Sequence, residues 1–330
     1  MVSLTKNTLE FSFPEVSSRA HCSVEFQRTL RIPDDNREYP LPPGLGTFPL
    51  LHVEDYPKKA PATWQDRGGV FLPMYQAEAL WLRFDGYYPC AVKIAAGKIN
   101  AVTGATWQND LSTRPQDYVV IPEQPWLDGF SVGKGLIRQF VAMPLGQGFT
   151  AEEQLTGKAD VGGIQICVYP MKREKYEELH PPLTEEELRD MPMFSRNCCV
   201  MEDSMGLAPG GLMRQEIFED EYGLDAWDTE SMSRCFIHLA NSEQFLSITG
   251  HAPPNEPPTA KQYTDAGMPW FEYYAADKTA LQGAKTLAEL DSVASKMVKL
   301  GKKYLKGNEP INPTRVVSLG HRNRVSDGQW

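Results

Sequence analysis

The stretch GKGLIRQFVAMPLGQG, residues 133–148, is closely matched by PGGLMRQEIFEDEYG, residues 209–223. Both contain glycine, leucine, an apolar residue, arginine and glutamine in that order. We therefore predict two related β-units, at residues 133–170 and 209–245, packed about a pseudo-two-fold axis. A coincidence over five residues is the alternative. The structural residues of the repeat are the equivalent pairs Arg138 with Arg214 and Gln139 with Gln215.

A strand-like run follows each copy after a polar excursion. These runs are GGIQICVYP at residues 162–170 and SRCFIHLAN at residues 233–241. The two arginines are expected to occupy equivalent structural positions. Because a buried guanidinium needs hydrogen-bond acceptors, each should hold loop carbonyl groups or a carboxylate.

Apolar patterns outside the repeat predict further strands. One of them, CAVKIAAGKINAV, should contain a turn near Gly97. The predicted strands are HCSVEFQRTLRI at residues 21–32, EALWLRF at 78–84, CAVKIAAGKINAV at 90–102 and DYVVIP at 117–122. Short strands joined by frequent glycine and proline favour a fold that is mainly β.

Helical signals are fewer. The capping box, in which threonine and glutamate satisfy each other's backbone amides, occurs at Thr150–Glu153, Thr184–Glu187 and Thr286–Glu289. Only the last opens a long amphipathic pattern, with Leu287, Leu290, Val293, Met297, Leu300 and Tyr304 at helical spacing. We predict an α+β fold, mainly β. Its β-rich body covers residues 1–280, and residues 281–330 form a C-terminal amphipathic helix and basic tail packed on the body or a neighbour.

The charge of the chain is unevenly distributed. The 330 residues carry a net charge of −10, which argues against a nucleic-acid partner. Residues 285–330 contain nine lysines and arginines against four acidic residues, a local charge of +5 that leaves −15 on the rest. A basic tail on an acidic body predicts association with itself, as a homo-oligomer or a larger assembly.

The N-terminal segment MVSLTKNTLEFSFPEVSSRAH lacks the uninterrupted apolar core of a secretory signal. The apolar runs fall short of the ~18 residues that a membrane-spanning helix needs. We therefore expect an intracellular protein, cytoplasmic or vacuolar, that does not insert into membranes. The cysteines are expected to be small buried apolar residues rather than a disulfide framework: Cys22, Cys90, Cys167, Cys198, Cys199 and Cys235.

Two motifs suggest catalytic or metal chemistry, and neither has the required context. Gly129-Phe-Ser131-Val-Gly133 fits the serine motif of α/β-hydrolases, yet the segments around it do not read as a strand leading into a helix. A glycine-rich turn is the favoured interpretation. Cys235 and His238 would point to opposite faces of a strand, so they should not share a metal ion. The sequence predicts no catalytic residues, no metal site and no cofactor.

Acidic and aromatic residues in loops provide an alternative. The acidic residues Glu219, Asp220, Glu221, Asp225 and Asp228 are dense enough for calcium, but they lack the spacing of an EF-hand loop, and a solvated turn is the commoner outcome. Tryptophans pair with carboxylates at two places, Trp126 with Asp128 and Trp227 with Asp225 and Asp228. Such pairs occur in sugar sites, although a tryptophan that anchors a loop on the core is commoner.

Five stretches together resemble a little-characterised family of bacterial and fungal proteins over most of the chain: REYPLPPGLGTFPL, GGVFLPMYQAEALWL, QDYVVIPEQPWLDG, IRQFVAMPLGQGFTAEEQLTG and AGMPWFEYY. The family is expected to include octin, which forms vacuolar crystals in certain fungi. The resemblance implies self-assembly and assigns no catalytic residue. The leading hypothesis is a non-enzymatic, self-associating protein of structural or storage type. The alternative is an enzyme or binding protein for a sugar-like or other polar ligand.

Overall fold

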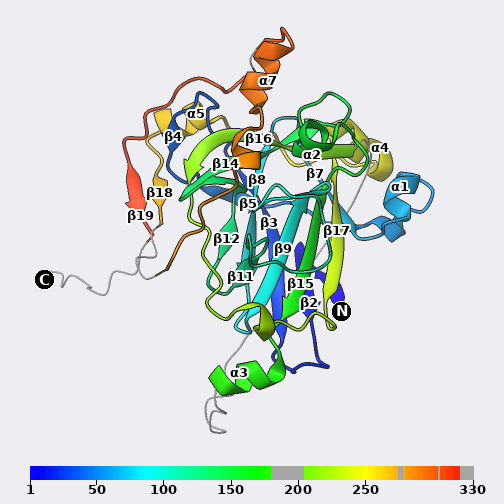
Figure 1. Cartoon of the computed structure of the whole chain (residues 1–330). Helices are drawn as coiled ribbons and strands as arrows, with labels where there is room; N and C mark the ends of the chain where they lie inside the picture. The colour runs from blue at the N-terminus through cyan, green and yellow to red at the C-terminus, as the bar shows by residue number, and fades with distance from the viewer. Residues whose placement is uncertain (180–203, 274–277, 304, 320–330) are drawn as a thin grey trace, which may run out of the picture.

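The computed structural model describes residues 1–179, 204–273, 278–303 and 305–319 (Figure 1). The capping box at Thr184–Glu187, the cysteines Cys198 and Cys199 and the apolar residue Tyr304 lie outside these ranges. Within them the fold is mainly β, as predicted. Seventeen strands belong to one hydrogen-bonded network, in which most pairs are antiparallel, and two further strands pair with each other.

The elements have the following bounds. The strands are β1 Val2–Thr5, β2 Thr8–Ser12, β3 His21–Thr29, β4 Glu38–Tyr39, β5 Gly44–Thr47, β6 Leu51–His52, β7 Val70–Pro73, β8 Ala79–Asp85, β9 Cys90–Ala96, β10 Ile99–Asn100, β11 Val119–Ile121, β12 Trp126–Leu127, β13 Gly129–Gly133, β14 Leu136–Pro144, β15 Ile164–Pro170, β16 Ser204–Arg214, β17 Ser233–Ala240, β18 Trp270–Glu272 and β19 Val316–Ser318. The helices are α1 Ala62–Gln65, α2 Ala151–Thr156, α3 Arg173–Leu179, α4 Ser242–Thr249, α5 Ala260–Asp265, α6 Lys285–Ala288 and α7 Val293–Lys299, with short 3-10 turns η1 Val53–Asp55 and η3 Leu224–Ala226.

The core lies between two groups of strands. β3 pairs with β8, and it alternates buried with half-exposed residues, as the sequence pattern predicts. β9 pairs with β15, and both strands are buried along their whole length. Figure 1 shows β9 and β15 in front of β2 and β3. Apolar side chains of both groups belong to one buried cluster, so the two groups pack face to face.

The strands predicted at residues 21–32, 78–84, 90–102 and 117–122 are confirmed as β3, β8, β9 with β10, and β11. The turn predicted near Gly97 is also present, and Gly97 has a φ of 58°. Each of these strands has apolar residues on the side that faces the core. The four described cysteines are buried and free, as expected for small apolar residues.

The two copies of the repeated pentapeptide pair with each other. β14 and β16 are antiparallel neighbours, and the register places Ile137 opposite Met213, which is the equivalent residue of the other copy. The runs that follow the two copies, β15 and β17, are likewise antiparallel partners. The repeated segments are therefore adjacent strands of one sheet.

The arginines of the repeat differ in environment. The Arg138 side chain is 12% exposed, donates to the Gly210 carbonyl at 3.1 Å and lies 3.7 Å from the Asp34 carboxylate. The Arg214 side chain is 54% exposed and lies 3.2 Å from the Glu38 carboxylate. Both guanidinium groups have a carboxylate neighbour, as expected, but only Arg138 is buried.

Of the two predicted capping boxes in the described residues, one is present and one is absent. Thr150 and Glu153 form the predicted capping box at the start of α2. The prediction at Thr286 is wrong, because α6 begins at Lys285 and Ala284 occupies its N-cap position.

The predicted C-terminal helix is interrupted. In place of one long helix the chain forms α6 and α7, which are four and seven residues long. Tertiary hydrogen bonds hold the break between them. The amide of Asp291 donates to the Gln154 side chain, and the Ser292 side chain caps α7. The apolar face is nevertheless buried at Leu287, Leu290, Val293 and Met297. In the described ranges no helix has the length and apolar character to cross a membrane.

Candidate ligand-binding pocket

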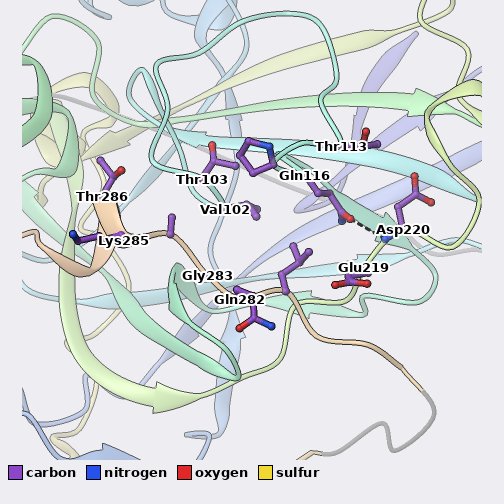
Figure 2. A pocket seen from close by; sticks show the side chains of 13 residues that line it. Val102, Thr103, Thr113, Gln116, Glu219, Asp220, Gln282, Gly283, Lys285 and Thr286 are labelled. Atoms are coloured by element: carbon purple, nitrogen blue, oxygen red, sulfur yellow. Dashed lines mark hydrogen bonds between the residues drawn. The ribbon is translucent and has the colours of Figure 1, made fainter.

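A cavity of about 610 Å³, here called the polar pocket, lies where three segments of the chain meet. The segments are residues 102–116 before β11, residues 219–220 after β16 and residues 281–286 leading into α6. Figure 2 shows Glu219 and Asp220 on one side of this pocket and Lys285 and Thr286 on the other. Residues far apart in the sequence therefore form one polar wall.

One glutamine ties the first two segments together. The Gln116 side-chain amide donates to the Phe218 carbonyl at 3.1 Å. It also accepts from the Asp220 amide at 2.8 Å, as Figure 2 shows. Gln116 is 7% exposed, so these bonds are largely shielded from water. The side chain thus gives this segment the backbone partners that a neighbouring strand would supply.

The third segment is held by backbone hydrogen bonds. The Leu281 amide donates to the Ile217 carbonyl at 2.7 Å, and the Ala284 amide donates to the Ser131 carbonyl at 2.9 Å. Between them Gly283 has a φ of +73°, and a Cβ there would lie 2.3 Å from the backbone nitrogen of Gly133. Only glycine allows residue 283 to lie this close to the Gly133 backbone. The backbone hydrogen bonds hold this wall of the pocket in place without a ligand.

The Asp220 carboxylate is hydrogen-bonded within the protein. Its carboxylate accepts from the Tyr118 hydroxyl at 2.5 Å, from the Trp227 indole at 2.9 Å and from the Tyr222 amide at 2.8 Å. Burial, followed by the bond to Asp220, raises the pKa of Tyr118 above its usual range. Tyr118 therefore remains a neutral donor, and Asp220 is part of the wall rather than a free acid.

Other side chains around the polar pocket are free to bind a ligand. Thr113, Glu219, Gln282 and Thr286 line it and make no side-chain hydrogen bond to another described residue. They supply two hydroxyl groups, one carboxylate and one amide. Lys285 adds a cation at the rim, where it lies 3.6 Å from Glu289. Such a mixture of donors and acceptors suits a ligand with many hydroxyl groups.

The second predicted tryptophan–carboxylate group does not form a binding site. Trp227 is 1% exposed and lies behind Asp220, so it anchors a loop on the core. The Asp228 carboxylate accepts from the Glu230 and Ser231 amides in a turn. Asp225 is exposed in η3 and lines no described pocket. Within the described ranges no histidine, cysteine or acidic residues are grouped as metal ligands would be.

The first predicted pair, Trp126 and Asp128, lines a different cavity of about 190 Å³. We call it the aromatic cleft, because Trp81 and Phe271 also line it, together with prolines from the segment before β5. Asp128 is 3% exposed, and its carboxyl accepts from the Gln215 side chain at 2.7 Å. Burial raises the pKa of this carboxyl to about 7.

The two motifs that suggested chemistry are structural. Ser131 lies inside β13, which is a strand rather than the predicted turn, and is 2% exposed, with no histidine bonded to it in the described chain. Its backbone pairs with Ala101 and Ala284. Cys235 and His238 both lie in β17, and His238 stacks on Trp64 with a ring separation of 4.7 Å. Burial lowers the pKa of His238 to about 4, which keeps the ring neutral.

Sequence patterns missed several of these residues. Trp81 alternates with the buried Leu80 and Leu82 in β8, so the strand period could have assigned it to the outer face. Thr113 and Gln282 carry no comparable signal, since they lie in irregular segments. Comparison of the chain with protein-family models, curated proteins and solved structures finds no match.

Proposed function

We propose that the protein binds a small ligand rich in hydroxyl groups, such as a monosaccharide or a related polyol, in the polar pocket. One observation carries this proposal. Four side chains with unused hydrogen-bonding capacity surround a cavity of about 610 Å³ whose walls are fixed by backbone bonds. A fixed wall reduces the entropy lost on binding, and a polyol offers both donors and acceptors to it.

The experiment is a binding screen of monosaccharides and polyols by ligand-observed NMR, followed by calorimetry on the best ligand. Glu219→Gln and Thr113→Val should each weaken binding by about tenfold, because a lost hydrogen bond to a ligand costs ~1–2 kcal/mol. Asp225→Asn is the matched control, since this carboxylate is exposed outside the pocket. The proposal fails if no compound binds, or if the pocket variants bind as well as the control.

Self-association is the second proposal, and a specific observation favours it. β19 pairs with β18 on one edge, and its other edge has no partner strand in the part of the chain that the structure describes. Val316, Val317 and Leu319 on this segment are 42%, 37% and 45% exposed. An exposed apolar edge strand is a template for pairing with a second copy.

Part of the tail's positive charge is used within the chain. Lys299 lies 2.6 Å from the Asp291 carboxylate, and Lys302 donates to Gln147 at 3.0 Å. We therefore place the association at the β19 edge, with charge as a secondary contribution. Such an edge would suit the structural or storage role that the family resemblance implies.

Sedimentation velocity at low and high salt tests this second proposal. Val317→Lys should convert a self-associated species to a smaller one, because edge lysines oppose strand pairing. Val298→Lys is the control, since Val298 is 57% exposed on α7, away from the edge. A wild-type chain that sediments as a monomer at every concentration would contradict the proposal.

We also propose that residues 133–170 and 209–245 are related units. The register that places Ile137 opposite Met213 supports a local two-fold axis between them. The two glutamines of the repeat support it as well. Gln139 bonds the Leu30 carbonyl and the Ile32 amide, while Gln215 bonds the Trp126 carbonyl and the Asp128 amide. Superposition of the two ranges in an experimental structure tests the relation.

A further inference from the structure

The aromatic cleft has the shape of a cage for a small cation. The ring centroids of Trp81 and Trp126 are 6.4 Å apart and the rings are inclined by 73°, so they form two walls nearly at right angles. Tyr273 packs against Trp126 at 4.8 Å and supports its position. Phe271 provides a third aromatic side chain. Aromatic faces attract cations through the ring quadrupole.

Asp128 places a carboxyl group at this cage, and a bound cation would favour its ionised form. It is the one charged residue among the described residues that line the cleft. No lysine, arginine or histidine of the described chain forms an ion pair with it, and its side-chain donors, Gln215 and Trp126, are both neutral. A buried carboxylate without a cationic partner is costly, and a bound cation would provide the missing charge.

Two cationic side chains near the cleft already pair with carboxylates. Arg83 lies opposite Trp126 in the pairing of β8 with β12, and its guanidinium lies 3.2 Å from the Glu25 carboxylate. Arg214 lies between the carboxylates of Glu38 and Glu272, at 3.2 and 3.9 Å. A ligand cation therefore meets no uncompensated positive charge from these two neighbours.

One donor at the cleft also lacks a partner. The Nε1 atom of Trp81 is buried and has no hydrogen-bond acceptor within the described residues. A ligand hydroxyl group would supply that acceptor once a shift of the ring on binding brings the N–H group into the cleft. The recognised molecule should therefore combine a cationic head with a nearby hydroxyl group.

We propose that the aromatic cleft binds a free quaternary ammonium alcohol of the choline type. Its trimethylammonium group packs against Trp81, Trp126 and Phe271 beside the Asp128 carboxylate, and its hydroxyl accepts from Trp81. The volume of about 190 Å³ suits a headgroup of this size rather than a large ligand. The net charge of −10 favours a cation that carries no anionic group of its own. The site is separate from the polar pocket, so the inference does not depend on the polyol proposal.

Calorimetry with the full-length protein tests the inference on two matched ligands. Choline should bind at least about tenfold more tightly than its uncharged carbon isostere, in which a carbon atom replaces the nitrogen. Equal or tighter binding of the isostere would overturn the assignment, because the cleft would then be a simple apolar pocket. An absence of saturable choline binding would also overturn it. These outcomes do not depend on whether any variant folds.

Variants then locate the binding. Asp128→Asn keeps the shape of the side chain and an acceptor for Gln215, and it should weaken choline binding by about tenfold, as should Trp126→Leu. Glu219→Gln removes a carboxylate from the polar pocket and should leave choline binding unchanged. If Glu219→Gln weakens choline binding while the two cleft variants do not, choline binds in the polar pocket and the inference is wrong.

A competition experiment and a vesicle experiment distinguish free choline from a lipid headgroup. The same trimethylammonium chemistry occurs on phosphatidylcholine. Free choline should compete with fluorescent choline for the protein, whereas vesicles of phosphatidylcholine should not deplete the protein from solution. Depletion by vesicles without binding of free choline would assign the cleft to a lipid and overturn the free-ligand assignment.

Discussion

The Asp128 carboxyl makes the free energy of unfolding depend on pH. Its pKa is raised from 3.8 to about 7, mainly by burial. The folded chain therefore holds this proton more tightly than the unfolded chain does. As the pH rises from about 4 to about 7, Asp128 ionises in the unfolded chain but keeps its proton in the folded chain. The free energy of unfolding therefore falls, by an upper bound of the order of 4 kcal/mol. Above pH 7 the whole loss remains.

Asp128→Asn cannot ionise and should remove this pH dependence. We expect the variant to match the wild type near pH 4 and to exceed its free energy of unfolding above pH 7, because no buried charge forms. Urea denaturation at several pH values measures the difference. Thr113→Val is the control, since Thr113 is exposed and the substitution changes no ionisable group. Equal slopes for Asp128→Asn and the wild type would contradict the prediction.

Four buried glutamines each join two segments of the chain through their side-chain amide groups. Each donates to a backbone carbonyl of a neighbouring segment and accepts from the backbone amide two residues further along that segment. Gln116 and Gln124 also donate to the Tyr118 and Trp126 carbonyls. Gln139 and Gln215 do this for residues 30–32 and 126–128. Gln116 and Gln124 do it at successive positions of residues 216–220. These side chains complete the backbone pairing where irregular segments have no strand beside them.

Gln139→Leu should lower the free energy of unfolding by about 2–5 kcal/mol, since it leaves the buried Leu30 carbonyl and Ile32 amide without partners. Urea denaturation measures the loss. Gln76→Leu is the matched control, because Gln76 is exposed and its replacement should change stability by less than about 0.5 kcal/mol. A loss below about 1 kcal/mol for Gln139→Leu would contradict the prediction and would indicate that water replaces the amide.

The strands could be predicted from sequence to the extent that a local pattern determines them. Cys22, Val24 and Phe26 alternate along β3, and the structure buries all three. The continuous helix predicted from Leu287 onward is wrong because Gln154, which is distant in sequence, binds the backbone at Asp291. Helical spacing records which residues face the core and cannot report such a distant partner.

The candidate sites show the same limit. The pairing of Trp126 with Asp128 is local, and the sequence identified it correctly as an aromatic and a carboxyl group in one place. The other aromatic walls come from β8 and β18, which only the folded chain brings together. The polar pocket likewise depends on three distant segments. No short-range sequence pattern predicts that these distant segments lie side by side.

Residues 305–319, the last described segment, pack on the β-rich body. Asn308 accepts from the Asp34 amide at 2.9 Å, and Ile311 is 7% exposed. The Trp270 amide donates to the Arg315 carbonyl at 2.8 Å as β19 joins β18. Residues 308–319 therefore contact the body of the same chain, which was one of the two arrangements left open by the sequence.

Ile311→Ala should consequently destabilise the whole protein by about 2–3 kcal/mol, because it removes buried apolar volume between the tail and the body. Thermal and urea denaturation both measure this loss. Val298→Ala is the control, since Val298 is 57% exposed and its truncation should change stability by less than about 0.5 kcal/mol. If Ile311→Ala unfolds like the wild type, the tail does not contribute to the cooperative unit.

The contact of Asn308 with Asp34 has a consequence for biosynthesis. It joins residues 274 positions apart, and β19 completes its pairing with β18 only near the end of the chain. During translation the N-terminal strands leave the ribosome long before these partners exist. Strands β2, β3 and β8 can pair with one another once residue 85 has emerged, whereas the Asp34 amide gains its Asn308 partner only after 274 further residues. The nascent chain therefore exposes the loop around Asp34 for most of its synthesis, and a stop codon before residue 308 would leave that loop without its partner.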